Sequence, residues 1–197
     1  DDNTLIEEHI AGIPGDMFIN TMMHTKHTNK VRLAKEFVKF NERCFVRLLG
    51  DMRSYNYVMD ITPDFDDVQY RIRAIDFDQQ CYEGRKNLYL PQFFRENFPL
   101  VELGMELIND KTVKQYQAEE RSLIARRLIA TRYRTKDLID CMEEDNISTP
   151  EKVKQLREDL AKHHSNTDFL ECENMGEILK LQLKSTLAKH IRKVRNI

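Results

Sequence analysis

The sequence predicts a mostly helical α+β domain whose few strands form one small β-hairpin. Three observations favour this class: a long amphipathic segment starts at Asn29, two short β-type runs lie between residues 55 and 77, and the remainder has the pattern of helices. Hydrophobic residues make up 41% of the chain and charged residues 32%, so a core can form beneath a heavily charged surface.

The chain opens with an extended segment and a turn. LIEEHI (5–10) is typical of a short strand, and the AGIPGD that follows holds two glycines and a proline, which stop any helix. Residues 17–25, MFINTMMHT, fit a short helix. Asn29 is a suitable N-cap for the long helix, and Gly50 is its expected C-cap.

The two β-type runs predict a hairpin. YNYVMDI (55–61) and YRIRAIDF (70–77) are separated by the acidic TPDFDD, which we expect to be the turn. After CYEGRKN the pattern is helical, and the Thr149-Pro150 pair places a proline near the first turn of one later helix. The last segment, from residue 174, is amphipathic and basic at its end.

Bulk properties exclude several classes of protein. The net charge of -2 argues against a domain whose whole surface is basic and binds nucleic acid. The four cysteines lie far apart without a CxxC pair, which favours reduced thiols in a cytoplasmic protein. No apolar run approaches the roughly 18 residues that a membrane helix needs. The opening DDNTLIEEHIAG has no initiator Met, which indicates a processed or excised fragment.

Three oxygen-bearing side chains stand at the ends of these elements. Asp51 and Asn56 lie in the loop between the long helix and the first β-run, and Asp76 lies just past the second run. Because a hairpin brings its two outer ends together, Asp76 should lie near Asn56. In phosphoryl transfer one carboxylate orients the attacking hydroxyl, while an amide oxygen and a second carboxylate hold Mg²⁺ on the nucleotide phosphates. The three residues therefore indicate that chemistry.

In these motifs the sequence resembles the C-terminal lobe of the protein-kinase-like fold, nearest to the branch that contains aminoglycoside and choline phosphotransferases. The catalytic loop of that branch, H-G-D-x-x-x-x-N, is matched by LGDMRSYN, with Gly50, Asp51 and Asn56 in register. Its metal motif, I-D-F-x after an apolar strand, is matched by IDFD (75–78). LIEEHIAGIPGD resembles the hinge between the two lobes. The resemblance covers about residues 5–130.

The resemblance implies a role for each of these residues. Asp51 would be the catalytic base, and Arg53 would neutralise charge on the transferred phosphate. Asn56 and Asp76 would be the Mg²⁺ ligands. Backbone groups of four hinge residues would flank the adenine of ATP: Glu7, Glu8, His9 and Ile10.

The same resemblance implies the organisation of the chain. Residues 1–16 would be a hinge-like segment, 17–135 the kinase-like C-lobe core, and 136–197 additional C-terminal helices of the same domain. The parent protein would transfer the γ-phosphoryl of ATP to an unknown hydroxyl acceptor, with no nucleic acid or membrane as partner. Nothing before Leu5 could form the Gly-rich loop, the phosphate-pairing Lys or its Glu partner. We therefore expect the N-terminal lobe to be missing in cis and this fragment alone to be inactive.

Two departures leave alternatives open. Leu49 replaces the usual His before the Gly-Asp pair, and Asp78 replaces the Gly of the D-F-G form. A pseudokinase, or a helical protein-interaction module whose partner surface is the tail after about residue 135, is one alternative. A helical structural domain in which the motifs are coincidental is the other.

The remaining candidates have a simpler interpretation as structural residues. Asp64, Asp66 and Asp67 lack the Gly and downstream Glu of an EF-hand and suit a solvated turn. His24 and His27 have helical metal spacing but no third ligand nearby, so we expect them to be exposed. We expect a loop at His163-His164, a passive thiol at Cys81, and helix-end cations in the basic terminal run.

Overall fold

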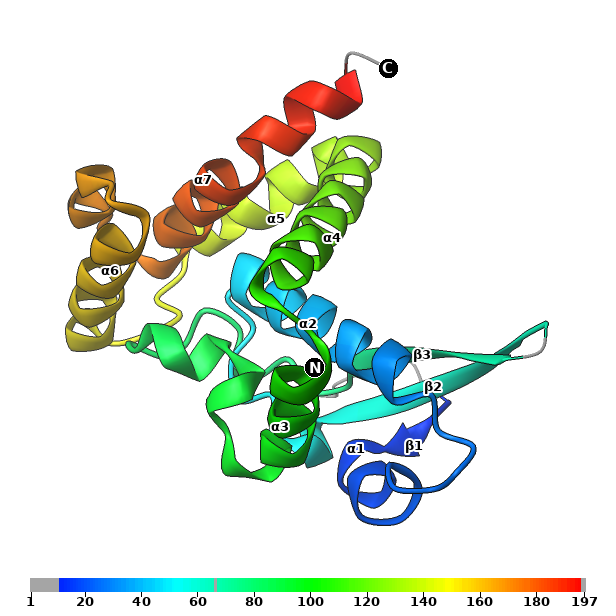
Figure 1. The fold of residues 1–197 in the computed structure, drawn as a ribbon. Coiled ribbons are helices and arrows are strands. Elements are labelled where there is room, and N and C mark those ends of the chain that lie inside the picture. Colours follow the sequence, from blue (N-terminus) through cyan, green and yellow to red (C-terminus); the bar gives the residue numbers. More distant parts are fainter. Residues whose placement is uncertain (1–10, 66, 196–197) are drawn as a thin grey trace, which may run out of the picture.

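The computed structural model describes residues 11–65 and 67–195. Within them the chain forms a three-stranded antiparallel sheet next to α2 and a group of helices further from the sheet, which confirms the predicted mostly helical α+β class (Figure 1). The strands are β1 (Ile13–Pro14), β2 (Tyr57–Asp64) and β3 (Asp67–Ala74). The α-helices are α1 (Gly15–Met17), α2 (Lys30–Arg47), α3 (Phe98–Leu107), α4 (Asp110–Ala130), α5 (Arg132–Glu144), α6 (Pro150–His164) and α7 (Met175–Arg195). Short helical turns fill several loops: η1 (Phe18–Met22), η2 (Ser54–Asn56), η3 (Lys86–Tyr89), η4 (Pro91–Phe93), η5 (Arg95–Asn97) and η6 (Thr167–Glu171).

The long helix α2 begins as predicted but ends earlier. Asn29 is its N-cap, and the Asn29 side chain accepts a hydrogen bond from the Arg32 N–H at 3.1 Å. The predicted C-cap, Gly50, is wrong: the helix ends at Leu48, a left-handed residue with φ 48°. The Leu48 side chain is fully buried, and this packing offsets the cost of a left-handed conformation in a residue with a Cβ. Gly50 has another role, because a Cβ there would lie 2.8 Å from the carbonyl oxygen of Gln79.

The hairpin is shifted toward its turn relative to the prediction, and residues 55–56 and 75–77 of the predicted runs are not strand. β2 and β3 pair from Tyr57 opposite Ala74 to Asp64 opposite Asp67, so most of the expected turn TPDFDD is strand. The reason lies at the start of α2, where Arg32 forms ion pairs with Asp64 at 2.8 Å and with Asp67 at 3.1 Å. These contacts hold the acidic residues against the helix instead of leaving them in a solvated turn.

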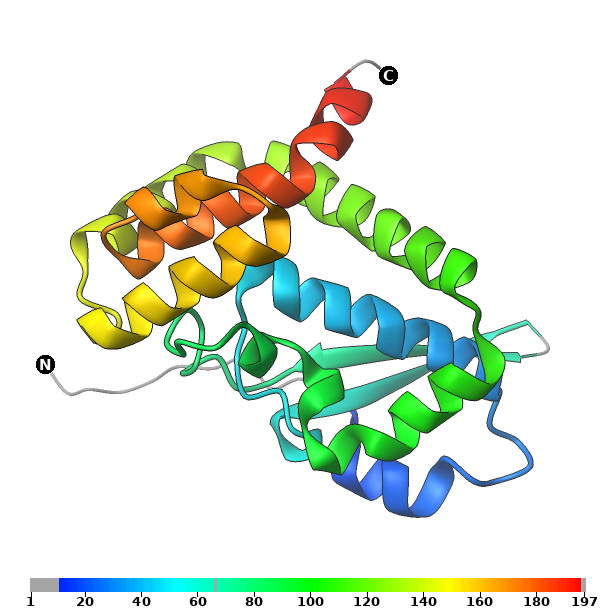
Figure 2. The same ribbon diagram turned by 60° about the vertical axis from the view of Figure 1, so that its left-hand side comes forward.

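The described residues form three core clusters that all draw on α2, the smallest of which joins Val46 to Ile124 of α4 and Leu187 of α7. Phe37 and Phe40 pack with the sheet and α3, whereas Phe45 and Leu48 pack with α6 and α7. α2 lies along the hairpin, with α4 on the side of α2 away from the sheet (Figure 2). The helix α2 therefore connects the sheet-bearing part of the chain with the C-terminal helices.

The C-terminal helices differ from prediction at one point. His163 and His164 form the end of α6 instead of a loop, because both imidazoles pack within 6.3 Å of the Phe45 ring. α5 packs against α7, and α7 packs against α4 (Figure 1). In the part of the chain that the structure describes, none of the helices is long and apolar enough to cross a membrane.

Candidate functional site

The loop after α2 holds Asp51 in a defined conformation. Asp51 has φ 52°, a left-handed conformation that Asp tolerates better than most residues with a Cβ. Its backbone N–H donates to the Leu88 carbonyl at 3.3 Å, and its own carbonyl accepts from the Arg53 N–H at 2.8 Å. The Asp51 side chain is about one-third exposed, so its carboxylate can be reached from solvent.

Asn56 is the closest partner of Asp51. Its Nδ2 donates to the Asp51 carbonyl at 2.7 Å and to Asp51 Oδ2 at 3.2 Å. Among the described residues, none donates to Asn56 Oδ1. The two hydrogen bonds from Nδ2 therefore fix the orientation of the Asn56 amide, and its Oδ1 is available as a metal ligand.

Asp76 follows β3 and lies at the same end of the hairpin. The neighbouring Ile75 N–H donates to the Asn56 carbonyl at 3.1 Å. One Asp76 oxygen, Oδ1, accepts from the Asp78 N–H at 3.2 Å. Burial raises the pKa of Asp76, and the nearby Asp78 and Asp51 carboxylates raise it further. The structure thus brings Asp76 within electrostatic range of Asp51.

Arg53 is held between two carboxylates. Its Nε donates to Asp51 Oδ1 at 2.9 Å and its Nη1 to Glu96 Oε1 at 2.8 Å, with the guanidinium 5.1 Å from the centre of the Phe94 ring. These hydrogen bonds, foremost the one that Arg53 donates to Asp51, raise the pKa of Arg53. The sequence motif pointed to Arg53 but not to Glu96, which lies 43 positions further along the chain.

Asn97 stabilises the Asp51 loop through a hydrogen bond to the Met52 backbone. The fully buried Asn97 donates to the Met52 carbonyl at 2.9 Å and to the Pro91 carbonyl at 2.8 Å, and it accepts from the Tyr57 hydroxyl at 2.8 Å. Leu49, which occupies the position of the usual His, is buried in the core instead. Support for the loop therefore comes from Asn97, which no motif in the sequence marks.

The segment that follows Asp76 also supports the loop. The Gly50 N–H donates to the Gln79 carbonyl at 3.3 Å, and the Cys81 N–H donates to the Leu48 carbonyl at 2.8 Å. Leu49 and Gln80 form an isolated antiparallel bridge between these hydrogen bonds. The two loops that carry Asp51 and Asp76 are thus joined through their backbones.

Asn56 and Asp76 could bind a divalent cation only if another molecule, such as a phosphate, supplied further ligands. Among the described residues, no group of three or more His, Cys, Asp or Glu side chains could hold a metal ion. Asn56 Oδ1 and the Asp76 carboxylate offer oxygen ligands of the kind that Mg²⁺ takes, and Mg²⁺ is commonly bound by one or two protein ligands plus phosphates. A cation there would also relieve the repulsion that raises the pKa of Asp76. The residues present therefore fit a phosphate-bound metal.

Other predicted candidates have clear positions. Glu7, Glu8, His9 and Ile10 lie outside the described residues, and so does Asp66. His24 and His27 are exposed. Cys81 is fully buried, and burial raises the pKa of its thiol to about 12, as suits a passive residue. Four cations of the basic terminal run are exposed on α7: Lys184, Lys189, Arg192 and Lys193.

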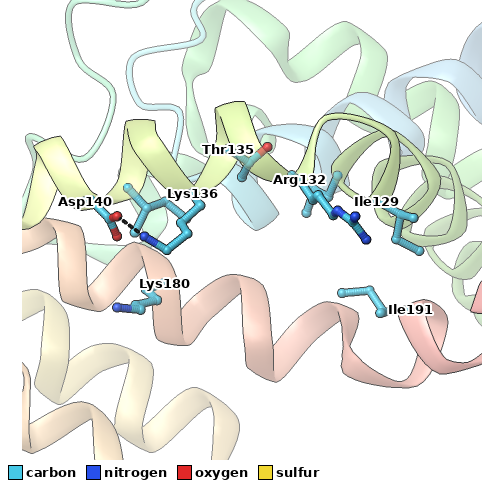
Figure 3. Close-up of a pocket in the computed structure, with 9 residues that line it drawn as sticks. Ile129, Arg132, Thr135, Lys136, Asp140, Lys180 and Ile191 are labelled. Atoms are coloured by element: carbon cyan, nitrogen blue, oxygen red, sulfur yellow. Dashed lines mark hydrogen bonds and ion pairs between the residues drawn. The ribbon is translucent and has the colours of Figure 1, made fainter.

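An apolar groove lies between α5 and α7, away from the Asp51 loop (Figure 3). Its volume is about 340 Å³, and Leu128, Ile139 and Ile191 are among its apolar lining residues. Its lysines are already paired, Lys136 with Asp140 at 2.5 Å and Lys180 with Glu143 at 2.8 Å. The groove therefore offers apolar surface but little unpaired charge.

At the Asp51 loop, a carboxylate and an amide lie side by side at an accessible surface, and the Asp76 segment is joined to the same loop through backbone hydrogen bonds. Such an arrangement can orient a hydroxyl at Asp51 and hold a phosphate-bound cation at Asn56 and Asp76. Comparison with known protein families, curated proteins and solved structures finds no match to this chain.

Proposed function

We propose that this chain carries the catalytic and metal-binding loops of a phosphotransferase with a protein-kinase-like fold. The reaction moves the γ-phosphoryl group of ATP to a hydroxyl acceptor. The observation that carries the proposal is the hydrogen bonding of Asn56 to Asp51 in a loop whose backbone is joined to the Asp76 segment. These contacts support the expectation from the two sequence motifs that the Asp51–Asn56 loop and the Asp76 segment lie close together.

Each residue has a role under this proposal. Asp51 accepts a hydrogen bond from the acceptor hydroxyl and orients it toward the phosphorus. Asn56 Oδ1 and the Asp76 carboxylate hold Mg²⁺, which neutralises charge on the ATP phosphates when bound. Arg53 holds Asp51 Oδ1 in place, and Glu96 fixes the direction of Arg53.

A second candidate function is a protein-interaction module. α5 has no buried residue, and Tyr133 and Leu138 on it are 70% and 58% exposed. Large apolar side chains that stay exposed on one element are typical of a binding surface. The two candidates differ at Asn56 and Asp76, because an interaction module has no use for metal ligands.

The first test measures metal binding by this chain. Mn²⁺ with ADP is titrated while amide NMR signals are followed, since Mn²⁺ broadens the signals of nearby nuclei. We expect broadening centred on Asn56 and Asp76, lost in Asp76→Asn and retained in the matched control Asp60→Asn, whose carboxylate pairs with Arg73 on the hairpin surface. Equal broadening in all three proteins would contradict the metal assignment.

The second test measures rate in a chain that includes a nucleotide-covering lobe. Asp51→Asn keeps the shape of the side chain but removes its proton-accepting carboxylate. We expect kcat to fall by about 10² or more, the usual contribution of a positioned acid or base. Undiminished ATP-dependent phosphorylation by this variant would refute the role of Asp51.

A further inference from the structure

Residues 82–89 are clamped onto α6 and its N-terminal turn. Ser148 Oγ donates to the Tyr82 carbonyl at 2.6 Å, and Lys152 Nζ pairs with Glu83 at 3.3 Å. Gly84 lies so close to α6 that a Cβ there would be 2.9 Å from the Lys152 Cα. The polypeptide that follows Gly84 is therefore held in one position against the helix.

A polar cavity of about 640 Å³ lies between this segment and α6. It is rich in side chains that donate hydrogen bonds, and its lining residues are Arg85, Lys86, Asn87, Gln155, Asp159, Lys162 and His163. Asp159 is its single carboxylate, and Asp159 Oδ2 already accepts from the Lys86 backbone N–H at 3.0 Å. The lining can therefore donate many more hydrogen bonds than it can accept.

The cations of this cavity are unpaired. Arg85, Lys86 and Lys162 form no ion pair with any residue that the structure describes. In contrast, Arg32 and Arg53 each contact two carboxylates. The three unpaired cations line one cavity together.

His163 is a further polar side chain of this cavity. Partial burial foremost, with smaller contributions from His164, Lys86 and Arg121, lowers the pKa of His163 to about 4. His163 is therefore neutral near pH 7 and adds no charge of its own. It can still form a hydrogen bond with a ligand.

We propose that this cavity binds a small hydrophilic ligand that carries a phosphate monoester. A dianion can use all three cations, and the Arg85 guanidinium can bind two phosphate oxygens at once. The volume lies within the roughly 300–1,000 Å³ of small-molecule sites, and the polar lining suits a hydrophilic ligand. The C-terminus of α6 opposes an anion with about half an elementary charge, which three cations outweigh.

The site is separate from the Asp51 loop, and the proposal stands whether or not the chain is a phosphotransferase. The two sites share one segment, because Lys86 lines the cavity and the Leu88 carbonyl accepts from the Asp51 N–H. Phosphate binding at the cavity is measured without ATP, metal or turnover. Its failure is thus distinguishable from failure of the proposed phosphoryl transfer.

Calorimetric titration of the chain with inorganic phosphate and with glycerol 3-phosphate, at constant ionic strength, tests the proposal. Glycerol is the uncharged control. We expect saturable binding of glycerol 3-phosphate with a Kd below about 1 mM, equivalent to about 4 kcal/mol. The His163 ring signals in the NMR spectrum should shift with the same saturation curve.

The variant Arg85→Gln/Lys162→Gln removes two exposed cations and should fold normally. We expect at least about tenfold weaker binding in this variant, and unchanged binding in Lys154→Gln, an exposed α6 lysine outside the cavity. Inorganic phosphate that binds as tightly as glycerol 3-phosphate supports recognition of the phosphate group itself. Equal affinity in the double variant and the wild type, or no saturation by about 10 mM, would overturn the proposal.

Discussion

Replacement of Asn97 by Ala should destabilise the fold more than most single substitutions, because Asn97 makes three buried hydrogen bonds. The loss is not equal among its partners. The Pro91 carbonyl keeps a second hydrogen bond, from the Phe94 N–H at 3.1 Å, whereas the Met52 carbonyl and the Tyr57 hydroxyl lose the partner that they have. Two buried groups are therefore orphaned.

The magnitude follows from these two groups. Each buried polar group left without a partner costs about 1–3 kcal/mol, so with two such groups we expect Asn97→Ala to lower the free energy of unfolding by about 2–6 kcal/mol. Typical domains have only about 5–15 kcal/mol in total. The loss should also loosen the Asp51 loop, because the Met52 carbonyl follows Asp51 directly.

Urea denaturation followed by circular dichroism measures this free energy. Tyr57→Phe in the Asn97→Ala background removes one orphaned group, so the double variant should be more stable than the sum of the two single effects predicts. Asn87→Ala, at an exposed position, is the control and should change stability by less than about 0.5 kcal/mol. A loss below about 1 kcal/mol for Asn97→Ala, or strict additivity with Tyr57→Phe, would refute the reasoning.

Three further predictions concern other parts of the chain. Arg43→Met leaves the buried carboxylates of Glu36 and Glu120 with only their longer ion pairs to Arg71, at 3.9 and 3.6 Å, and should cost about 3–5 kcal/mol in urea denaturation; a neutral result would contradict the importance of the network. The pKa of His163 is lowered on folding, so the unfolded chain binds a proton first as pH falls below about 6.5. Stability should therefore decrease from pH 7 toward pH 4, and less so in His163→Gln; parallel melting-temperature curves would contradict this. Cys141 is the exposed cysteine, so a thiol reagent should modify it rapidly in the folded chain and the other three cysteines only on unfolding; fast reaction at all four would contradict the described burial.

Local sequence signals predicted much of the fold. The N-cap at Asn29 and the proline at the start of α6 were correct, because capping depends on residues within one turn. The hairpin was also predicted, but its strands were placed too far from the turn, since the pattern could not show Arg32 lying beside Asp64 and Asp67. The end of α2 was placed two residues late for a similar reason: tertiary burial of Leu48 overrode the usual preference for Gly.

The support of the candidate site could not be predicted in this way. The motifs marked Asp51, Asn56 and Asp76, but Glu96 and Asn97 are more than 40 positions from the loop residues Arg53 and Met52 that they contact. No periodicity or spacing rule links residues so far apart in sequence. These contacts depend on how the 3₁₀ turns before α3 fold back beneath the loop, which is a property of packing rather than of local pattern.

The hydrogen bonds of Asp51 indicate from which side an acceptor hydroxyl would approach under the proposed function. Arg53 occupies Oδ1 at 2.9 Å and is itself fixed by Glu96, so displacing it breaks two charge-assisted hydrogen bonds. Oδ2 has only the longer contact with Asn56, at 3.2 Å, and that nitrogen keeps its 2.7 Å bond to the Asp51 carbonyl when Oδ2 is engaged elsewhere. A hydroxyl can therefore bind Oδ2 at little cost. That side of Asp51 is also the side of Asn56, where the cation and its phosphate would be held, and so the acceptor and the phosphoryl group would meet without rearrangement of the loop.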